Sequence, residues 1–507
     1  MTDKELSNKL GQLLVIGFQG YTASEHLSKI LNIVQPGGII LFEHNIKNKQ
    51  QVKALNKNIY SLVKIKPFIT CDQEGGSVER LRKICTSTAS PWGLAKCSEK
   101  ALLDSQKIIA TELLELGFNM TLAPALDINT NKANPIINTR ALSNKPEIVS
   151  ALGEKIIKLY LKYNLVPVAK HFPGHGDLKV DSHLSLPILN KSKAKLYKLE
   201  FIPFIKAIKN KVPIVMVSHI QLPQIEKDKK VSASISGKII KDILQKELKF
   251  KGLIITDDLA MKGITKYNSI ENAAYKAILA GADMVLINSD ERMILKVFNA
   301  LLEKSKKNLT LRNRINESYK KILFTKQKYL NHKVKRSIAH NKTLSHKITQ
   351  GVVHWIKKDL FFNPVLKHET IDITYPITPK LQLSDLKAIC KELSLQKVNF
   401  IPYNINPKGS DIANVLKKLN NKTRKVVISY NAYAWTGQKV LLNKILDLYH
   451  DIIVISSGLE FDLELAPRIK NFIAAYATNY VSLLVAFEKL SLKIKGTYAR
   501  AFKNTKS

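Results

Sequence analysis

The chain has few cysteines and no long apolar run. Its four cysteines, at positions 71, 85, 97 and 390, form no CxxC pair and no metal-ligand spacing, which excludes a disulfide-stapled scaffold and indicates reduced thiols. No stretch approaches the roughly 18 apolar residues that cross a bilayer. The opening MTDKELSNKLGQLLVIGF mixes acids and bases before a short apolar run, unlike a secretory signal. We therefore expect a cytoplasmic protein that makes no membrane contact.

Acidic residues are also scarce relative to basic ones. The 41 Asp and Glu stand against 80 Lys and Arg, which gives a formal net charge of +39. The densest basic segment, 304–347, holds 14 Lys and Arg and a single acid, Glu317. The sequence lacks zinc-finger spacing, an RNP-like aromatic strand and a basic heptad region. We interpret the charge as surface composition that permits weak polyanion binding, and expect no specific nucleic-acid partner.

Eight short β-branched runs alternate with amphipathic helical segments through the first part of the chain. The runs are 13–18, 37–42, 67–73, 119–128, 166–172, 213–219, 252–258 and 282–288. Strands that alternate with helices pair in parallel, and eight of them favour a closed (β/α)8 barrel over an open sheet. The segment GFQGYTAS (17–24) lacks the glycine spacing of a dinucleotide-binding loop, which further disfavours the open sheet.

A second, smaller unit follows the predicted barrel. Two helical stretches lead to the basic segment HKVKRSIAHNKTLSHK, after which strand-like and helical runs alternate again. The predicted fold class is α/β, a TIM-type barrel followed by an α/β sandwich. We place a catalytic barrel domain at 1–333, a basic linker at 334–349 and the sandwich at 350–507. The sandwich has no cluster of His, Asp, Glu and Cys at its strand ends, so we assign it no catalytic residue.

Chemically useful side chains follow directly after the predicted barrel strands. They are Asp72, Asp127, Lys170, His171, His219, Asp257 and Asp258. Barrel enzymes gather their chemistry at the carboxyl ends of the strands, so this placement predicts an active site there. Adjacent aspartates point to opposite sides of a strand. We expect Asp257 to face the site, because Asp258 is placed to cap a helix or its first turn.

The run KHFPGHGDLKVDSH (170–183) packs three histidines and two aspartates into one loop. His171 and His175 copy the spacing of helical zinc ligands, but the proline and glycine between them break such a helix, so we expect no metal. The i, i+2 spacing of Asp181 and His183 places both side chains on one side of an extended chain. The aspartate then favours the protonated imidazole, whose other nitrogen becomes a proton donor.

Two further segments add polar groups to the same end of the barrel. In DQEGGSVER (72–80), a carboxylate on Asp72 and a guanidinium on Arg80 suit hydrogen bonds to a polyol, with a structural salt bridge across the turn as the alternative. The segment NPIINTR (134–140) follows the fourth strand and contributes Arg140.

Together KHFPGHG…DSH, ITDD, DQEGGSVER and NPIINTR resemble the family 3 glycoside hydrolases, specifically the bacterial β-N-acetylglucosaminidases of peptidoglycan recycling. The resemblance covers about residues 5–330. It implies that Asp257 is the catalytic nucleophile, His183 the general acid/base and Asp181 its partner, with no cofactor. It also implies that N-acetylglucosamine is bound by Asp72, Arg80, Arg140, Lys170 and His171. Ser77 departs from the family, in which a basic residue is frequent at this position.

The resemblance implies a retaining exo-enzyme that removes terminal β-linked N-acetylglucosamine (GlcNAc) from peptidoglycan fragments such as GlcNAc-1,6-anhydro-N-acetylmuramyl peptides. A histidine acid/base adds no negative charge beside an incoming anion, so phosphorolysis in the same site stays open. From another class, a non-catalytic saccharide- or polyanion-binding protein also stays open, although the intact Asp257, Asp181 and His183 set argues against it.

Overall fold

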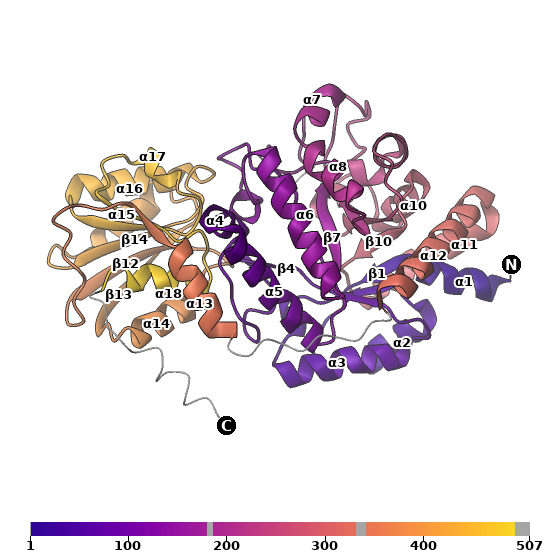
Figure 1. The fold of residues 1–507 in the computed structure, drawn as a ribbon, viewed down its shortest axis with the longest axis horizontal. Helices are drawn as coiled ribbons and strands as arrows, with labels where there is room; N and C mark the ends of the chain where they lie inside the picture. The colour runs from indigo at the N-terminus through magenta and orange to yellow at the C-terminus, as the bar shows by residue number, and fades with distance from the viewer. Residues whose placement is uncertain (1, 180–185, 331–340, 492–507) are drawn as a thin grey trace. The chain divides into compact units, whose positions relative to one another are not determined.

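The chain forms two compact units, Met1–Ser345 and His346–Ser507, in a computed structural model that describes residues 2–179, 186–330 and 341–491 (Figure 1). Helix α13 (Asn341–Val352) contains the point of division. Residues 341–349 of the predicted linker are therefore helical, whereas 334–340 lie outside the described residues. The domain limits 1–333 and 350–507 stay a prediction. Among the described residues, no helix has the length and apolar character needed to cross a membrane.

The first unit is a nearly closed barrel of eight parallel strands, as predicted, and each predicted run contains one of them. The strands are β1 (Leu14–Ile16), β2 (Gly38–Ile40), β3 (Phe68–Thr70), β6 (Met120–Thr121), β7 (Val166–Phe172), β8 (Ile214–Val217), β9 (Leu253–Asp258) and β10 (Met284–Ile287). Their order is β3-β2-β1-β10-β9-β8-β7-β6. Asn119 joins the two ends, because its amide donates to the Ile69 carbonyl at 3.1 Å and its Oδ1 accepts from the Ile69 amide at 2.8 Å.

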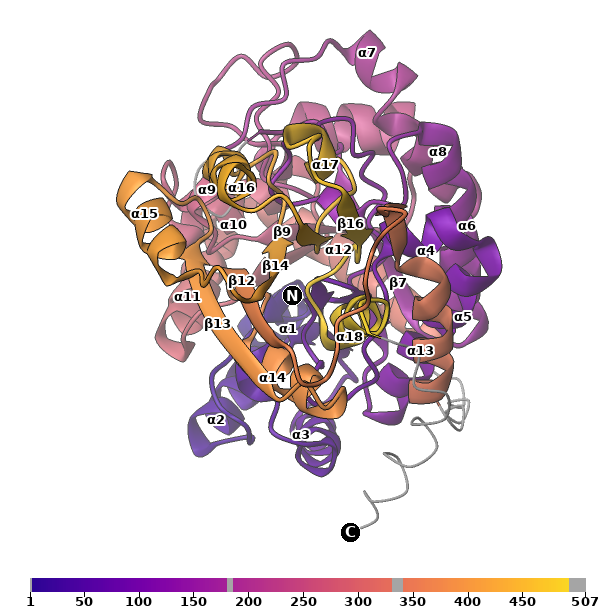
Figure 2. The same ribbon diagram turned by 90° about the vertical axis from the view of Figure 1, so that its left-hand side faces the viewer.

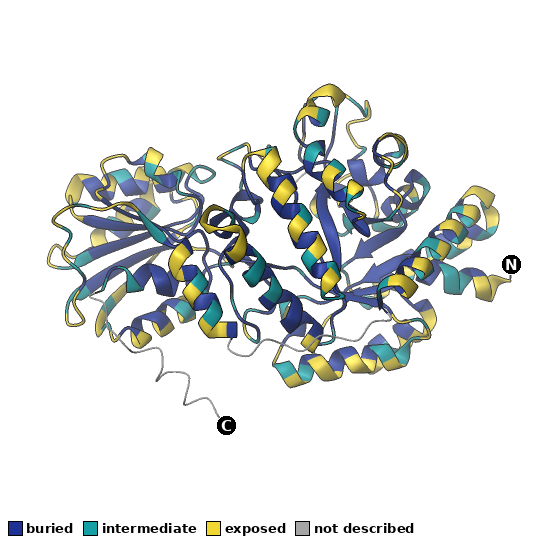
Figure 3. Cartoon of the chain, viewed as in Figure 1, coloured by how far each residue is buried: buried dark blue, intermediate teal, exposed yellow. Residues whose placement is uncertain are grey.

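Helices cover the outside of this barrel and turn a buried stripe toward it (Figure 3). In α6, buried residues recur every three or four positions, which is the period of an amphipathic helix. Ser98 caps α5 by accepting the Ala101 amide at 3.1 Å. The helices are α1 (Asp3–Gly11), α2 (Glu25–Val34), η1 (Glu43–Asn45), α3 (Lys49–Leu62), α4 (Pro91–Cys97), α5 (Glu99–Glu115), η2 (Asn138–Arg140), α6 (Pro146–Lys162), α7 (Lys193–Lys198), α8 (Phe201–Lys209), η3 (Ala233–Ile235), the π-helix η4 (Lys238–Glu247), α9 (Lys262–Thr265), α10 (Ile270–Ala280), α11 (Glu291–Lys307) and α12 (Leu309–Leu330).

Most barrel strands are shorter than their predicted runs, and two of them differ the most. The run 119–128 forms a strand only over Met120–Thr121, and Pro124, which lacks an amide hydrogen, interrupts the ladder before an isolated bridge between Ala125 and Lys170. The run 67–73 ends at Thr70 and is followed by a hairpin of β4 (Gln73–Gly75) and β5 (Val78–Glu79). The glycine pair in its turn has positive φ angles of 94° and 62°, which glycine adopts without strain.

The second unit is an α/β sandwich around a six-stranded sheet, ordered β11-β16-β15-β14-β12-β13. All neighbours are parallel except β11 and β16. The strands are β11 (His354–Lys357), β12 (Thr370–Ile377), β13 (Lys397–Asn404), β14 (Arg424–Ser429), β15 (Ile452–Ser456) and β16 (Asn471–Ala474). The helices are α14 (Leu383–Glu392), α15 (Gly409–Lys418), α16 (Thr436–Leu448), α17 (Asp462–Leu465) and α18 (Tyr480–Glu488).

Alternation along these strands builds two cores, one on each face of the sheet. In β14, Val426 and Ile428 pack with α14 and α18, whereas Val427 packs with α15 and α16. Figure 2 shows these two helix pairs on opposite sides of the sheet. A central parallel strand buried on both faces needs such an uninterrupted apolar run.

Candidate active site

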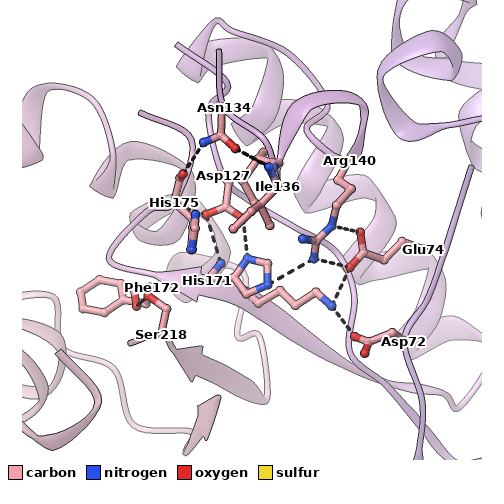
Figure 4. Close-up of polar contacts among 12 residues, drawn as sticks. Asp72, Glu74, Asp127, Asn134, Ile136, Arg140, His171, Phe172, His175 and Ser218 are labelled. Atoms are coloured by element: carbon pink, nitrogen blue, oxygen red, sulfur yellow. Dashed lines mark hydrogen bonds and ion pairs between the residues drawn. The ribbon is translucent and has the colours of Figure 1, made fainter. Parts of the chain in front are cut away.

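A network of buried charges occupies the carboxyl end of the barrel at β3 and β7 (Figure 4). Lys170, on β7, is 1% exposed. Its Nζ lies 2.7 Å from Asp72 Oδ1 and 2.6 Å from Glu74 Oε1. Asp72 and Glu74 stand two positions apart on an extended segment, so both carboxylates reach the same side. One lysine thus ties the end of β7 to the segment that follows β3.

Glu74 also fixes Arg140, which lies in η2. Arg140 Nε donates to Glu74 Oε2 at 2.9 Å and Nη2 donates to Oε1 at 2.8 Å. This bidentate geometry holds the guanidinium plane in one orientation. Burial raises the pKa of Glu74, but the charges of Arg140 and Lys170 outweigh burial and hold that pKa well below its ordinary value. Glu74 is therefore an anion that positions two cations.

His171 continues the network on its other side. Its Nδ1 lies 2.6 Å from Asp127 Oδ2, and Arg140 Nη2 lies 3.3 Å from its Nε2. Because a guanidinium can only donate, Nε2 accepts, and Nδ1 carries the hydrogen that Asp127 accepts. Asp127 also accepts the amide hydrogens of His171 at 3.3 Å and of His175 at 2.7 Å. The imidazole of His171 is thereby fixed in both orientation and tautomer.

The electrostatics of the network keep its members ionised. Burial raises the pKa of Asp72, but Lys170 and Arg80 outweigh it, and the pKa lies below its ordinary value. Burial lowers the pKa of Lys170, but Asp72 and Glu74 outweigh it, and the pKa lies above its ordinary value. In contrast, burial and the neighbouring His171 lower the pKa of His175 to about 4. His175 is thus neutral near pH 7.

Arg80 is the most exposed member of the predicted binding set. Its Nη2 lies 3.7 Å from Asp72 Oδ2, its guanidinium lies 5.6 Å from the centre of the Phe42 ring, and its side chain is 39% exposed. Arg80 Nε has no hydrogen-bond partner among the described residues. The contact with Asp72 is a loose ion pair, and the exposed part of the guanidinium keeps hydrogen-bond donors available to a ligand.

Asp257 and Asp258 end β9, which lies two strands from β7 around the barrel. Asp258 Oδ1 accepts the amides of Ala260 and Asn288, both at 3.0 Å, so this carboxylate holds the loops after β9 and β10. Asp257 Oδ1 accepts the amide of Asp258 at 2.9 Å. The carbonyl of Asp258 lies 2.9 Å from Nε2 of buried His219. These contacts give Asp258 and His219 structural roles and set the backbone that carries Asp257.

The predicted pair Asp181 and His183 lies outside the described residues. The start of their loop is anchored: Asn134 Nδ2 donates to the His175 carbonyl at 2.8 Å. Farther along, Lys191 Nζ lies 2.9 Å from Asp177 Oδ2. The described chain before and after this segment is therefore joined through Asp177 and Lys191.

Five predicted binding residues are joined by contacts: Asp72, Arg80, Arg140, Lys170 and His171. Sequence reasoning left Glu74 and Asp127 out of the binding set, although both lie at its centre. The i, i+2 spacing of Asp72 and Glu74 was a usable indication. The pairing of Asp127 with His171, 44 positions apart, had no local indication. Among the described residues, no three His, Cys, Asp or Glu side chains gather as a metal site.

Comparison with known proteins shows the family to which the domain that carries this site belongs. The glycosyl hydrolase family 3 N terminal domain matches residues 5–324. Beta-hexosaminidase A of Pseudoalteromonas piscicida is 32% identical over 317 residues, which are 55% of this chain, and the chain spans only 53% of that relative. The beta-hexosaminidase of Haemophilus ducreyi is 30% identical over 333 residues, 64% of this chain and 91% of that protein. Among solved structures, a family 3 beta-N-acetylglucosaminidase from Paenibacillus sp. str. FPU-7 is 29% identical, with a TM-score of 0.85 and 96% of each chain covered.

Proposed function

The chain belongs to glycosyl hydrolase family 3, and we propose that it is a retaining exo-β-N-acetylglucosaminidase. It is a glycoside hydrolase of the β-hexosaminidase type. The proposed substrates are peptidoglycan fragments, GlcNAc-1,6-anhydro-N-acetylmuramyl peptides, from which it releases terminal β-linked GlcNAc. The proposed setting is peptidoglycan recycling in the cytoplasm, which is where such soluble fragments and an enzyme with unpaired cysteines would meet.

The observation that carries this proposal is the fixed charge network, which lies at the same carboxyl end of the barrel strands as Asp257. Asp72, Arg80, Arg140, Lys170 and His171 offer acceptors and donors in orientations that their mutual contacts already set. A sugar ring presents hydroxyl and amide groups that need such partners. Because these side chains are already ordered, they lose little conformational entropy when the ligand binds.

In the first step, the Asp257 carboxylate attacks the anomeric carbon of GlcNAc. The bond from that carbon to the glycosidic oxygen breaks, and His183, protonated and supported by Asp181, gives its proton to the departing oxygen. The product is a glycosyl-aspartate ester, and the aglycone leaves as a neutral alcohol.

In the second step, water replaces the aglycone. His183, now neutral, takes a proton from water, whose oxygen attacks the anomeric carbon as the ester bond to Asp257 breaks. Two displacements at one carbon restore the β configuration, so the GlcNAc product is initially the β-anomer. Because the imidazole is uncharged at this stage, phosphate is the competing nucleophile to be tested.

One incubation tests the proposal. The full chain is mixed with GlcNAc-1,6-anhydro-N-acetylmuramyl peptide, with and without phosphate, and the products are identified by mass. We expect free GlcNAc in both mixtures. If GlcNAc 1-phosphate forms in the mixture with phosphate, the reaction is phosphorolysis and not hydrolysis. Binding of the fragment without any product would favour the non-catalytic alternative.

A further inference from the structure

A tight turn between β11 and β12 displays two apolar side chains to solvent. Leu360 is 96% exposed and Phe361 is 87% exposed, the highest values among the large apolar residues of the described chain. Ile356 and Leu366, in the same segment, are 37% and 36% exposed. Single exposed apolar residues are ordinary, but a group of them in one segment marks an interaction surface. We call this segment, residues 356–366, the apolar turn.

Hydrogen bonds define the shape of the apolar turn. The Asp359 carboxylate accepts the amide of Phe361 at 2.9 Å, and the Asp359 carbonyl accepts the amide of Phe362 at 3.2 Å. The amide of Asp359 donates to Asn471 Oδ1 at 3.0 Å, which ties the turn to β16. An aspartate that bonds to the backbone two residues on stabilises a turn. The exposure of Leu360 and Phe361 therefore follows from a specified conformation.

Aromatic packing supports the base of the same turn. Phe362 packs edge-on against Trp355, with 4.9 Å between the ring centroids. Lys358 Nζ lies 5.6 Å from the Trp355 centroid and 5.3 Å from that of Phe362. This contact draws one end of the turn inward while Leu360 and Phe361 point away from the core.

Basic side chains gather at the same edge of the second unit. Strands β12, β13, β14 and β16 run parallel, so they begin at one edge, and β11 runs antiparallel and ends there. Near these strand ends stand Lys357, Lys358, Lys367, Lys397, Lys422, Arg424 and Lys470. Arg424 pairs with Asp451 at 3.2 Å, and Lys470 lies 3.8 Å from Asp359.

Two other lysines of this edge have no neutralising carboxylate among the described residues. Lys397 and Lys422 are exposed and form no ion pair within the described residues.

We propose that this edge docks on the surface of a bilayer that contains anionic phospholipid. Leu360 and Phe361 enter the interface between headgroups and acyl chains, and the lysines bind the acidic headgroups. A nucleic acid would satisfy the lysines, but its backbone offers no apolar phase for the exposed pair. A second copy of the chain would bring two strongly basic surfaces together, which repel each other. From the sequence alone we expect no membrane contact, and the displayed turn is the observation that argues otherwise.

Vesicle sedimentation of the full chain tests the apolar contribution. We expect binding to vesicles of phosphatidylcholine and phosphatidylglycerol, and little binding to phosphatidylcholine alone. The double variant Leu360→Ser, Phe361→Ser should bind about a hundredfold more weakly, since each lost apolar insertion is worth about tenfold. Leu309→Ser with Phe324→Ser is the matched control, because both residues are 66% exposed on the first unit, and it should bind as the parent does. Turnover of a soluble aryl N-acetylglucosaminide should be the same in all three proteins.

The charge contribution is tested separately. Lys397→Gln with Lys422→Gln should weaken binding by about fivefold per residue, and added salt should weaken binding of the parent. Lys57→Gln with Lys162→Gln, two exposed lysines of the first unit, should have a smaller effect. Three results would each overturn the proposal: equal binding to both kinds of vesicle, vesicle binding that the serine pair leaves unchanged, or no vesicle binding at all. If duplex DNA is then bound, the edge is a polyanion surface, and a dimer abolished by the serine pair would assign it to a second copy.

Discussion

Each unit buries a carboxylate at the carboxyl ends of its parallel strands, but the two carboxylates have opposite electrostatic surroundings. In the barrel, Glu74 contacts Lys170 at 2.6 Å and Arg140 at 2.8 Å, and these cations outweigh burial and lower its pKa. In the second unit, Asp462 accepts Ser429 Oγ at 2.7 Å and Ser456 Oγ at 3.1 Å. Burial raises the pKa of Asp462 to about 6, despite those hydrogen bonds.

The difference shows what each carboxylate is for. Opposite charges held in fixed positions leave further donors and acceptors for a polar ligand, which is the arrangement of a binding site. The oxygens of Asp462 accept hydrogen bonds from two hydroxyls and, at 2.9 Å, from the amide of Ala432. Asp462 therefore holds together the loops after β14 and β15. This comparison supports the proposal that the catalytic chemistry belongs to the barrel unit.

The largest effect is expected at Asp257. Asp257→Asn should reduce turnover on the order of 10⁴-fold or more, because the amide cannot form the glycosyl ester. Asp462→Asn, the matched change in the second unit, should leave turnover within a few-fold. A 5-fluoro-N-acetylglucosaminyl donor should label Asp257, which peptide mass analysis locates. A label on Asp258 instead, or inactivation without any label, would contradict the assignment.

His183 gives the next largest effect. His183→Ala should reduce turnover by about 10²- to 10⁴-fold on substrates with poor leaving groups, and less on activated aryl substrates, whose departure needs little protonation. Azide should restore turnover of the activated substrate and yield a β-azide, and Asp181→Ala should show a milder loss. An equal loss for all leaving groups, with no rescue by azide, would contradict the assignment of His183 as the proton donor. The search for a proton donor would then turn to the second unit.

Removing the central anion of the network should have an intermediate effect. Glu74→Gln leaves Lys170 and Arg140 as close cations without their shared partner. We expect kcat/KM to fall by about 10²-fold and the free energy of unfolding to fall by about 3–5 kcal/mol, as when one partner of a buried pair is lost. Glu271→Gln, the same change in a pair whose lysine, Lys296, is 65% exposed, should cost no more than about 1 kcal/mol. Kinetics and denaturant unfolding measure both, and equal effects of the two variants would show that Glu74 has no organising role.

The smallest expected effect is on the pH dependence of the free energy of unfolding, to which Glu74 and Asp462 contribute with opposite sign. Glu74 has a lowered pKa, so the stability it adds is present above its ordinary value of 4.5 and is lost as the pH falls. Asp462 has a raised pKa, so its protonated form favours folding below the ordinary value of 3.8, and that stability is lost as the pH rises through about 6. From pH ~7 to ~4, the parent should therefore gain up to about 3 kcal/mol relative to Asp462→Asn. Over the same range its advantage over Glu74→Gln should shrink, and calorimetry that finds one sign for both variants would refute the contrast.

Much of the architecture could be predicted because it depends on local pattern. β-branched runs alternating with amphipathic helices specify parallel strands and their crossovers, and each of the eight predicted runs contains a barrel strand. Strand limits were less predictable, since Pro124 ends the ladder of β6 early. The order of residues along each strand also determined which side chains stand at its carboxyl end, including Asp257.

Only the tertiary structure decided how those side chains pair. Lys170 contacts Asp72, 98 positions away in the sequence, and Arg140 contacts Glu74, 66 positions away. No local periodicity specifies a contact at such sequence separations. These pairings depend on barrel closure, which brings the ends of distant strands to one rim. The exposure of Leu360 and Phe361 was likewise decided by packing, because an apolar pair in a sequence is buried or displayed according to what folds around it. Composition and pattern thus determined the elements and the chemistry available, whereas the three-dimensional arrangement determined the partners, the charges and the surface.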